Sequence, residues 1–277
     1  GSSLASRGVV VVAINYRLGS FGFLGEDNFG VLDMISALQW VNRNIAAFDG
    51  DANNVTIFGE SAGGSAVVSL MSSPDTNGLF HKAWAMSPSI GQLRSKERAL
   101  QAEQMFLQHA GVSSRNDLQS LTIAEMLDVQ AKLEAIPTDN FDFFTPAGGG
   151  RSLPHDIVTT AAQSPVPFVI GTNRDENRLW AALDPAQNQL GEEHWNDLCQ
   201  QTFGEHALRA KNIYEQTRPE ESPWQLISSI RTDTAFRQRA QRISEQRVQA
   251  NNKTWMYWFT WPTPVLDGIV GSCHGLD

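Results

Sequence analysis

The apolar positions of the chain form two kinds of pattern, short uninterrupted runs and stretches with helical spacing. Residues 8–15 (GVVVVAIN) are a continuous β-branched run, which is typical of a strand buried on both faces of a parallel sheet. Apolar residues then recur every three or four positions and predict a crossover helix over about Gly30–Ala47. The turn residues at 49–54 and the apolar run Val55–Phe58 predict a loop followed by a second strand.

A second helix is predicted directly after that strand, over Ala62–Met71, where small and apolar residues follow one another. Further strands are expected at Lys82–Met86, Val166–Gly171 and Thr254–Trp261. Strands that alternate with helices in this order predict an α/β fold with a mostly parallel, doubly wound sheet.

Long helical patterns lie between and after these strands. They are expected at Ser95–Ala110, Thr122–Ile136, Glu192–Phe203, His206–Gln216 and Pro223–Ala250. The first two exceed what a crossover needs, so we expect them to form a cap or wall over the carboxyl edge of the sheet. No repeat or low-complexity segment divides the chain, and residues 1–277 are predicted to form a single domain.

Composition excludes several classes of function. A formal charge of −9 repels nucleic-acid phosphates and anionic membrane surfaces, so no nucleic-acid partner is expected. No run approaches the roughly 20 consecutive apolar residues that cross a bilayer, so no membrane span is expected. Cys199 and Cys273 are too few for a disulfide scaffold and are expected to be free thiols.

Residues 59–63 (GESAG) carry the candidate chemistry. The pattern Gly-x-Ser-x-Gly between a strand and a helix is that of a nucleophile elbow, which makes Ser61 the candidate nucleophile. Small residues must flank the strained turn, as Gly59, Gly63 and Gly64 do, and the helix N-terminus would stabilise an oxyanion. A purely structural interpretation, in which the glycines allow close packing and Ser61 caps the helix, is disfavoured by the flanking strand and helix.

The residues around this motif resemble a known family. Residues 48–64 (FDGDANNVTIFGESAGG) are similar to the active-serine signature of type-B carboxylesterases, which include bacterial para-nitrobenzyl esterase-like enzymes and, more distantly, the cholinesterases. The similarity continues through 11–24 and 30–45 and covers nearly the whole chain. It implies an α/β-hydrolase fold with inserted helices over the active site, and the hydrolysis of small-molecule carboxylic esters.

The resemblance also implies the acid of a catalytic triad. In that family the acid is a Glu in a short motif that ends a strand, and residues 171–177 (GTNRDEN) are similar to it, which points to Glu176. A carboxylate at this strand end lies on the sheet edge where Ser61 emerges. On chemistry alone Asp175 could orient a histidine equally well, and only the resemblance selects Glu176.

Residues 271–275 (GSCHG) are similar to the family's histidine segment, which implies His274 as the general base. The order Ser61, Glu176, His274 is the order of α/β-hydrolases. The other five histidines lack such a glycine motif and are expected to be structural or exposed.

Two further positions, Ala62 and Ser87, follow from the resemblance, and a third, Glu60, follows from its place beside the nucleophile. The backbone N–H of Ala62 is expected to donate to the oxyanion. Ser87 matches a serine that lies close to the catalytic centre in relatives, and Glu60 beside the nucleophile is expected to influence the charge of the pocket. The family's glycine-rich oxyanion loop is not found, and the run Gly148–Gly150 follows the wrong strand and is expected to be a flexible loop.

Because that loop and the segments beyond His274 are not found, the chain is expected to be an internal fragment that lacks N- and C-terminal parts of an esterase. The first seven residues carry no readable targeting sequence. A cytoplasmic location is favoured, with secretion left open because the N-terminus is expected to be missing. No cofactor or metal is expected, and the sequence does not allow a protein partner to be inferred.

Two other functions stay open. One is a catalytically silent, cholinesterase-like binding protein, although such proteins typically lose a member of the triad. The other is an amidase, thioesterase or lactonase that uses the same triad, since ester chemistry is preferred through the resemblance alone. Acyl preference depends on pocket walls such as residues 138–153, whose shape the sequence does not give.

Overall fold

A computed structural model describes residues 1–136 and 143–277, so the first part of the expected pocket wall at 138–153 lies outside the described residues. The strands are β1 (Thr56–Glu60), β2 (Lys82–Met86), β3 (Phe168–Asn173) and β4 (Thr254–Phe259). The helices are α1 (Ser2–Ala5), α2 (Gly19–Phe23), α3 (Phe29–Asn44), α4 (Ala62–Ser72), α5 (Lys96–Ala110), α6 (Ile123–Glu134), α7 (Ile157–Gln163), α8 (Arg178–Leu183), α9 (Glu192–Phe203), α10 (Ala207–Thr217), α11 (Pro223–Thr232) and α12 (Gln238–Gln249). A π-helical turn, Asp233–Arg237, joins the last two.

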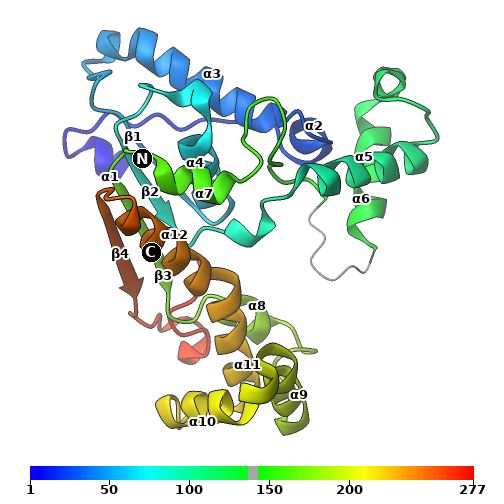
Figure 1. The fold of residues 1–277 in the computed structure, drawn as a ribbon, viewed down its shortest axis with the longest axis vertical. Helices are drawn as coiled ribbons and strands as arrows, with labels where there is room; N and C mark the ends of the chain where they lie inside the picture. The colour runs from blue at the N-terminus through cyan, green and yellow to red at the C-terminus, as the bar shows by residue number, and fades with distance from the viewer. Residues whose placement is uncertain (137–142) are drawn as a thin grey trace.

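The four strands form one parallel sheet in the order β1-β2-β3-β4 (Figure 1). This confirms the α/β class that the alternation of strands and helices predicts. Parallel strands end at a common edge, so the residues after β1, β2 and β3 meet there. Apart from the strand expected at residues 8–15, the predicted strands and long helices are found within a few residues of their expected limits, whereas the short helices α1, α2, α7 and α8 were not predicted.

Helices α4 and α12 pack on one face of the sheet, and α7 packs against both of them. Together with α3, these helices contribute to the largest apolar core. Ile57, Ala83 and Phe168 pair across neighbouring strands on this face and are buried. Arg247 of α12 is also fully buried, and it donates hydrogen bonds to carbonyl groups that include those of Ala161 and Val166. Those contacts tie α12 to α7 and to the start of β3.

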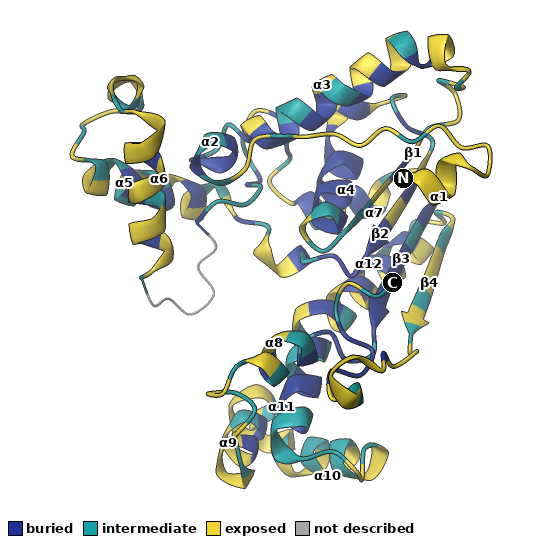
Figure 2. Cartoon of the chain, turned by 180° about the vertical axis from the view of Figure 1, so that it is seen from behind, coloured by how far each residue is buried: buried dark blue, intermediate teal, exposed yellow. Residues whose placement is uncertain are grey.

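The neighbouring residues of the same strands point to the opposite face. One cross-strand row on that face consists of Phe58, Trp84, Val169 and Trp255. The three aromatic side chains in the row are 39% to 56% exposed. Figure 2 shows exposed stretches of the strands on this side. This face of the sheet is therefore apolar and open to solvent.

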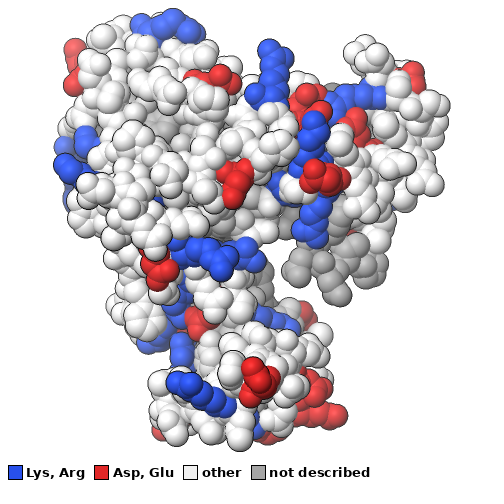
Figure 3. Space-filling model, viewed as in Figure 1, with Lys and Arg blue, Asp and Glu red and all other residues white. Residues whose placement is uncertain are grey.

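Two helical groups extend from the sheet, each with its own small core. The helices α5 and α6 project to one side, and α8 to α11 lie beyond the carboxyl ends of the strands (Figure 1). On the face shown in Figure 3, basic and acidic side chains are interspersed. Within residues 1–136 and 143–277, no helix is long and apolar enough to pass through a bilayer.

The strand predicted at residues 8–15 is wrong. Within the described chain, residues 9–15 form neither a helix nor a strand, and Val9, Val10, Val12 and Ile14 are 41% to 49% exposed. A β-branched run favours an extended backbone, but a strand also needs a second backbone to complete its hydrogen bonds.

The expectation of a flexible loop at Gly148–Gly150 is also corrected. A Cβ on Gly150 would lie 2.0 Å from the carbonyl oxygen of Glu26, and one on Gly148 would lie 2.5 Å from that of His155. The neighbouring Ala147 is fully buried. These glycines allow the loop to pack tightly against other backbone segments. Cys199 and Cys273 are buried free thiols, as the sequence predicts.

Candidate active site

Ser61 lies on the sharp turn between β1 and α4. Its backbone has φ 57° and ψ −117°, a conformation that costs a residue with a side chain about 1–3 kcal/mol. The turn is held because the Ser61 N–H donates to the carbonyl of Met86 at 2.9 Å, while the Ser61 carbonyl accepts from the N–H of Ser65 at 3.0 Å. The strained turn predicted from the Gly-x-Ser-x-Gly motif is therefore present.

At two of the three glycine positions around the turn, a larger residue would clash with neighbouring backbone atoms. A Cβ on Gly59 would lie 2.5 Å from the backbone of Gly63, and one on Gly64 would lie 2.9 Å from the carbonyl oxygen of Met86. A Cβ on Gly63 would meet nothing within 4 Å. Gly59 and Gly64 thus let β1, α4 and β2 approach closely, whereas Gly63 has room for a side chain.

Helix α4 begins directly after Ser61. The N–H of Ala62 begins the helix, where backbone donors lack a partner within the helix. No backbone acceptor within the described residues takes this N–H, and Ala62 is exposed. The partial positive charge of the helix end adds to this donor, so an anion beside Ser61 would be stabilised.

Glu176 lies in the turn after β3 and is fully buried. Its Oε1 accepts the backbone N–H of Asn173 at 2.6 Å, and its Oε2 lies 2.7 Å from Nδ1 of His274. Sequence chemistry left the choice between Glu176 and Asp175 open, and the structure brings Glu176 to the imidazole.

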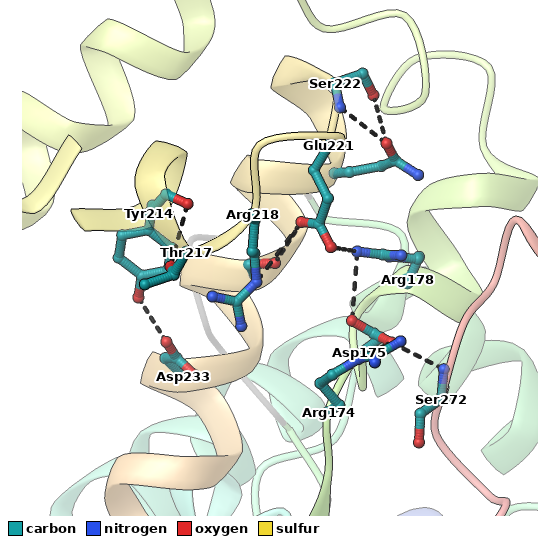
Figure 4. A network of polar contacts seen from close by, with 12 residues as sticks. Arg174, Asp175, Arg178, Tyr214, Thr217, Arg218, Glu221, Ser222, Asp233 and Ser272 are labelled. Atoms are coloured by element: carbon teal, nitrogen blue, oxygen red, sulfur yellow. Dashed lines mark hydrogen bonds and ion pairs between the residues drawn. The ribbon is translucent and has the colours of Figure 1, made fainter. Parts of the chain in front are cut away.

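Asp175 points the other way and contacts the backbone of the histidine loop. Its Oδ2 accepts the N–H of Ser272 and the Nε–H of Arg174, both at 2.9 Å, while Arg178 lies 3.3 Å from Oδ1 (Figure 4). The two adjacent carboxylates therefore have different partners: Glu176 binds the imidazole, and Asp175 binds the loop that carries it.

The imidazole of His274 is enclosed by aromatic rings and carboxylates. Trp180 and Phe236 lie 4.9 and 5.1 Å from it, centroid to centroid. Burial alone would lower the pKa of His274, but the hydrogen bond and charge of Glu176, with the charges of Glu60 and Asp277, outweigh it and raise the pKa above its ordinary value.

The second ring nitrogen of His274 faces Glu60. Nε2 lies 3.1 Å from Oε1 of Glu60, as an ion pair without the alignment of a hydrogen bond. Within the described residues no hydrogen bond joins His274 to Ser61, whose Oγ instead lies 3.4 Å from Oγ of Ser89. The histidine thus lies against the residue before the nucleophile rather than on the nucleophile.

Glu60 and Ser87, both expected near the centre, lie at this same edge. Burial raises the pKa of Glu60, the charges of Asp277 and Glu176 add to this, and the charge of His274 opposes it. Ser87 is fully buried with φ 41°, and its Oγ donates to the carboxylate of Asp277 at 3.2 Å.

Four residues of the site, Ser89, Trp180, Phe236 and Asp277, were not predicted from the sequence. Ser89 follows β2 as Ser61 follows β1, so the common strand edge was an available signal. Trp180 and Phe236 come from helical segments whose approach to His274 depends on tertiary packing, and no local pattern marks them. Among the described residues, no three His, Cys, Asp or Glu side chains gather as a metal site would need.

The chain is similar to known proteins along its whole length. A family model described as the carboxylesterase family matches residues 1–277. A para-nitrobenzyl esterase of Bacillus subtilis is 35% identical over 94% of this chain and 55% of the relative, and a phenmedipham hydrolase of Pseudarthrobacter oxydans is 29% identical over 97% and 55%. The chain thus spans about half the length of these curated relatives.

Solved structures show the same fold. A carboxylesterase of Geobacillus stearothermophilus superposes with a TM-score of 0.82 at 35% identity, covering 96% of this chain and 58% of that one. A PNB esterase structure superposes with a TM-score of 0.76 at 31% identity, covering 95% and 57%. These superpositions confirm the expected α/β-hydrolase fold.

Proposed function

The chain belongs to the carboxylesterase family, and from that premise we propose that it hydrolyses carboxylic esters through an acyl-enzyme formed on Ser61. The observation that carries the proposal is the 2.7 Å contact between Glu176 and Nδ1 of His274, beside the strained turn of Ser61. A buried carboxylate on Nδ1 is what a histidine needs to act as a base through Nε2.

In the proposed mechanism, Glu176 holds the Nδ1–H tautomer of His274, so Nε2 is the basic atom. The imidazole turns from Glu60 to Ser61, and Nε2 accepts the hydroxyl proton as Oγ attacks the ester carbonyl. The proton then passes from Nε2 to the leaving alcohol, and the acyl group stays on Oγ. Water, deprotonated by the same nitrogen, releases the carboxylic acid and restores Ser61.

The developing oxyanion is proposed to lie at the N-terminus of α4. The N–H of Ala62 is the donor that this chain offers there, and the helix end adds partial positive charge. The substrate class is a small-molecule carboxylic ester, since relatives of about 30% identity are named as esterases and hydrolases.

The test is covalent labelling with a fluorophosphonate, followed by peptide mapping of the labelled serine. Wild type is expected to carry the label on Ser61, Ser61→Ala to lose it, and Ser89→Ala, which removes the neighbouring hydroxyl, to keep it. Equal labelling of wild type and Ser61→Ala would contradict the proposal. Glu176→Gln is expected to lower kcat for p-nitrophenyl acetate by about 10⁴-fold, since it favours the wrong tautomer.

A further inference from the structure

A chain of buried charges links the outer helical group to the loop that carries His274 (Figure 4). It begins at Glu221, between α10 and α11, and passes through Arg178 of α8 to Asp175. The side chains of Asp175 and Arg178 are 0% and 7% exposed. The proposed chemistry uses none of these three residues.

Each link has a defined contact. The guanidinium of Arg178 donates to Oε1 of Glu221 and lies 3.3 Å from Oδ1 of Asp175. On its other side, Oδ2 of Asp175 accepts the N–H of Ser272, and the Asp175 N–H donates to the Ser272 carbonyl, both at 2.9 Å. Ser272 stands two residues before His274.

The histidine loop is shaped to admit this carboxylate. Gly271 has φ 60°, and a Cβ there would lie 2.4 Å from Oδ2 of Asp175. The loop therefore requires glycine at this position for two reasons, backbone conformation and the approach of Asp175.

Arg178 is the more buried of the two cations that contact Asp175, although its 3.3 Å contact with Oδ1 is an ion pair without a hydrogen bond. The other cation in contact, Arg174, is 36% exposed, so solvent screens its charge more strongly. Without Arg178, the buried carboxylate of Asp175 would keep Arg174 as its only contacting cation. A buried charge that is compensated less well is unfavourable, and it relaxes by taking up a proton or by moving toward water. Either response would loosen its hold on Ser272.

We propose that Arg178 is a positioning residue for His274, acting through Asp175 on the Ser272 backbone, with Glu221 fixing the direction of the guanidinium. This inference rests on the proposed function, because the pose of His274 matters when its Nε2 has to move between Glu60 and Ser61. A misplacement of the base by about 1 Å can cost on the order of 100-fold in rate.

The experiment uses the 277-residue chain with Arg178→Gln, Arg178→Lys and Glu221→Gln, and with Arg242→Gln on the exposed side of α12 as the matched control. It measures kcat and KM for p-nitrophenyl acetate, and the titration of His274 by NMR of ¹³C-labelled histidine, assigned with His274→Gln. Arg178→Gln is expected to lower kcat by about 10- to 100-fold with KM changed less than about 2-fold.

The His274 titration should move to lower pH in Arg178→Gln, since a looser bond to Glu176 stabilises the imidazolium less. Arg178→Lys, which keeps the charge, should recover part of kcat and of the titration shift, and Arg242→Gln should match wild type. A variant that loses thermal stability but keeps the wild-type kcat and titration would overturn the inference.

Two further outcomes are distinguished. If Arg178→Gln does not fold, Glu221→Gln becomes the deciding variant, because it keeps the pair of Arg178 with Asp175. Decreases in kcat and in the titration pH of His274 that are smaller than those expected for Arg178→Gln would support the inference. Wild-type values of both would overturn it. If the wild-type chain neither hydrolyses the ester nor takes the label, the proposed function fails. The His274 titration then still shows whether Arg178 sets the environment of the imidazole.

Discussion

Glu60 is the residue that most affects how His274 could work. Its carboxylate lies on the Nε2 side of the ring, while Glu176 holds the Nδ1 side. A protonated imidazole between two carboxylates is stabilised in place, whereas a neutral imidazole is held on the Nε2 side only weakly. In the proposed mechanism, deprotonation of His274 would therefore both create the base and free it to reach Ser61.

The pH dependence of hydrolysis follows from this arrangement. Because the pKa of His274 is raised, activity is expected to fall as the pH drops through that raised value, where the imidazolium forms. Glu60→Gln removes one of the charges that raise the pKa, so the acidic limb of kcat/KM should move to lower pH. The pH–rate profile measures this, with the exposed Glu245→Gln as control. An acidic limb that stays in place would contradict the role of Glu60.

Motifs predicted the residues that the structure groups at the strand edge, but not their contacts. Asp175 and Glu176 are adjacent carboxylates on one turn, and only the path of the backbone decides which of them faces the imidazole. The contact between Glu60 and His274 joins residues more than 200 positions apart and depends on side-chain orientation, for which a sequence has no local signal.

At the scale of elements, the turn after β1 depends on close backbone packing. The strand and α4 approach so closely that a Cβ added to Gly59 would lie 2.5 Å from backbone atoms of Gly63. Backbone atoms cannot move aside as the end of a flexible side chain can, so the contact constrains the whole strand–turn–helix unit.

Gly59→Ala is therefore expected to lower the free energy of unfolding by about 1–3 kcal/mol or more, since the added methyl group overpacks the turn. Gly63→Ala is the matched control: it adds the same methyl group in open space within a helix, where Ala is favoured over Gly by up to about 1 kcal/mol. Urea unfolding of both variants measures the difference. Equal destabilisation by the two changes would show that the clash at Gly59 is not the cause.

Elements that carry a long hydrophobic pattern were predicted well from the sequence. Short elements, and a segment that would need a neighbouring strand to pair with, were not. The periodic run of α3 and the apolar runs of β2 and β3 determine their own structure. Helix α8, with 6 residues, is too short for a helical period to be seen. Residues 8–15 carry the composition of a buried strand, but that composition cannot supply the neighbouring backbone that a strand requires.

On the scale of the whole molecule, the helices that pack on the sheet leave the row of Phe58, Trp84 and Trp255 exposed, at 50%, 39% and 56%. Scattered exposed apolar residues are ordinary, but these three aromatic residues form a contiguous apolar row with Val169, which lies between Trp84 and Trp255. Contiguous exposed apolar patches of this kind are typical of surfaces that bind apolar molecules. The chain is therefore expected to bind the dye ANS in its native state.

The double variant Trp84→Thr with Trp255→Thr keeps strand propensity and should lower ANS fluorescence by about half. Leu208→Thr, which removes an exposed apolar side chain from α10, should leave it unchanged, and an undiminished signal in the double variant would show that the dye binds elsewhere.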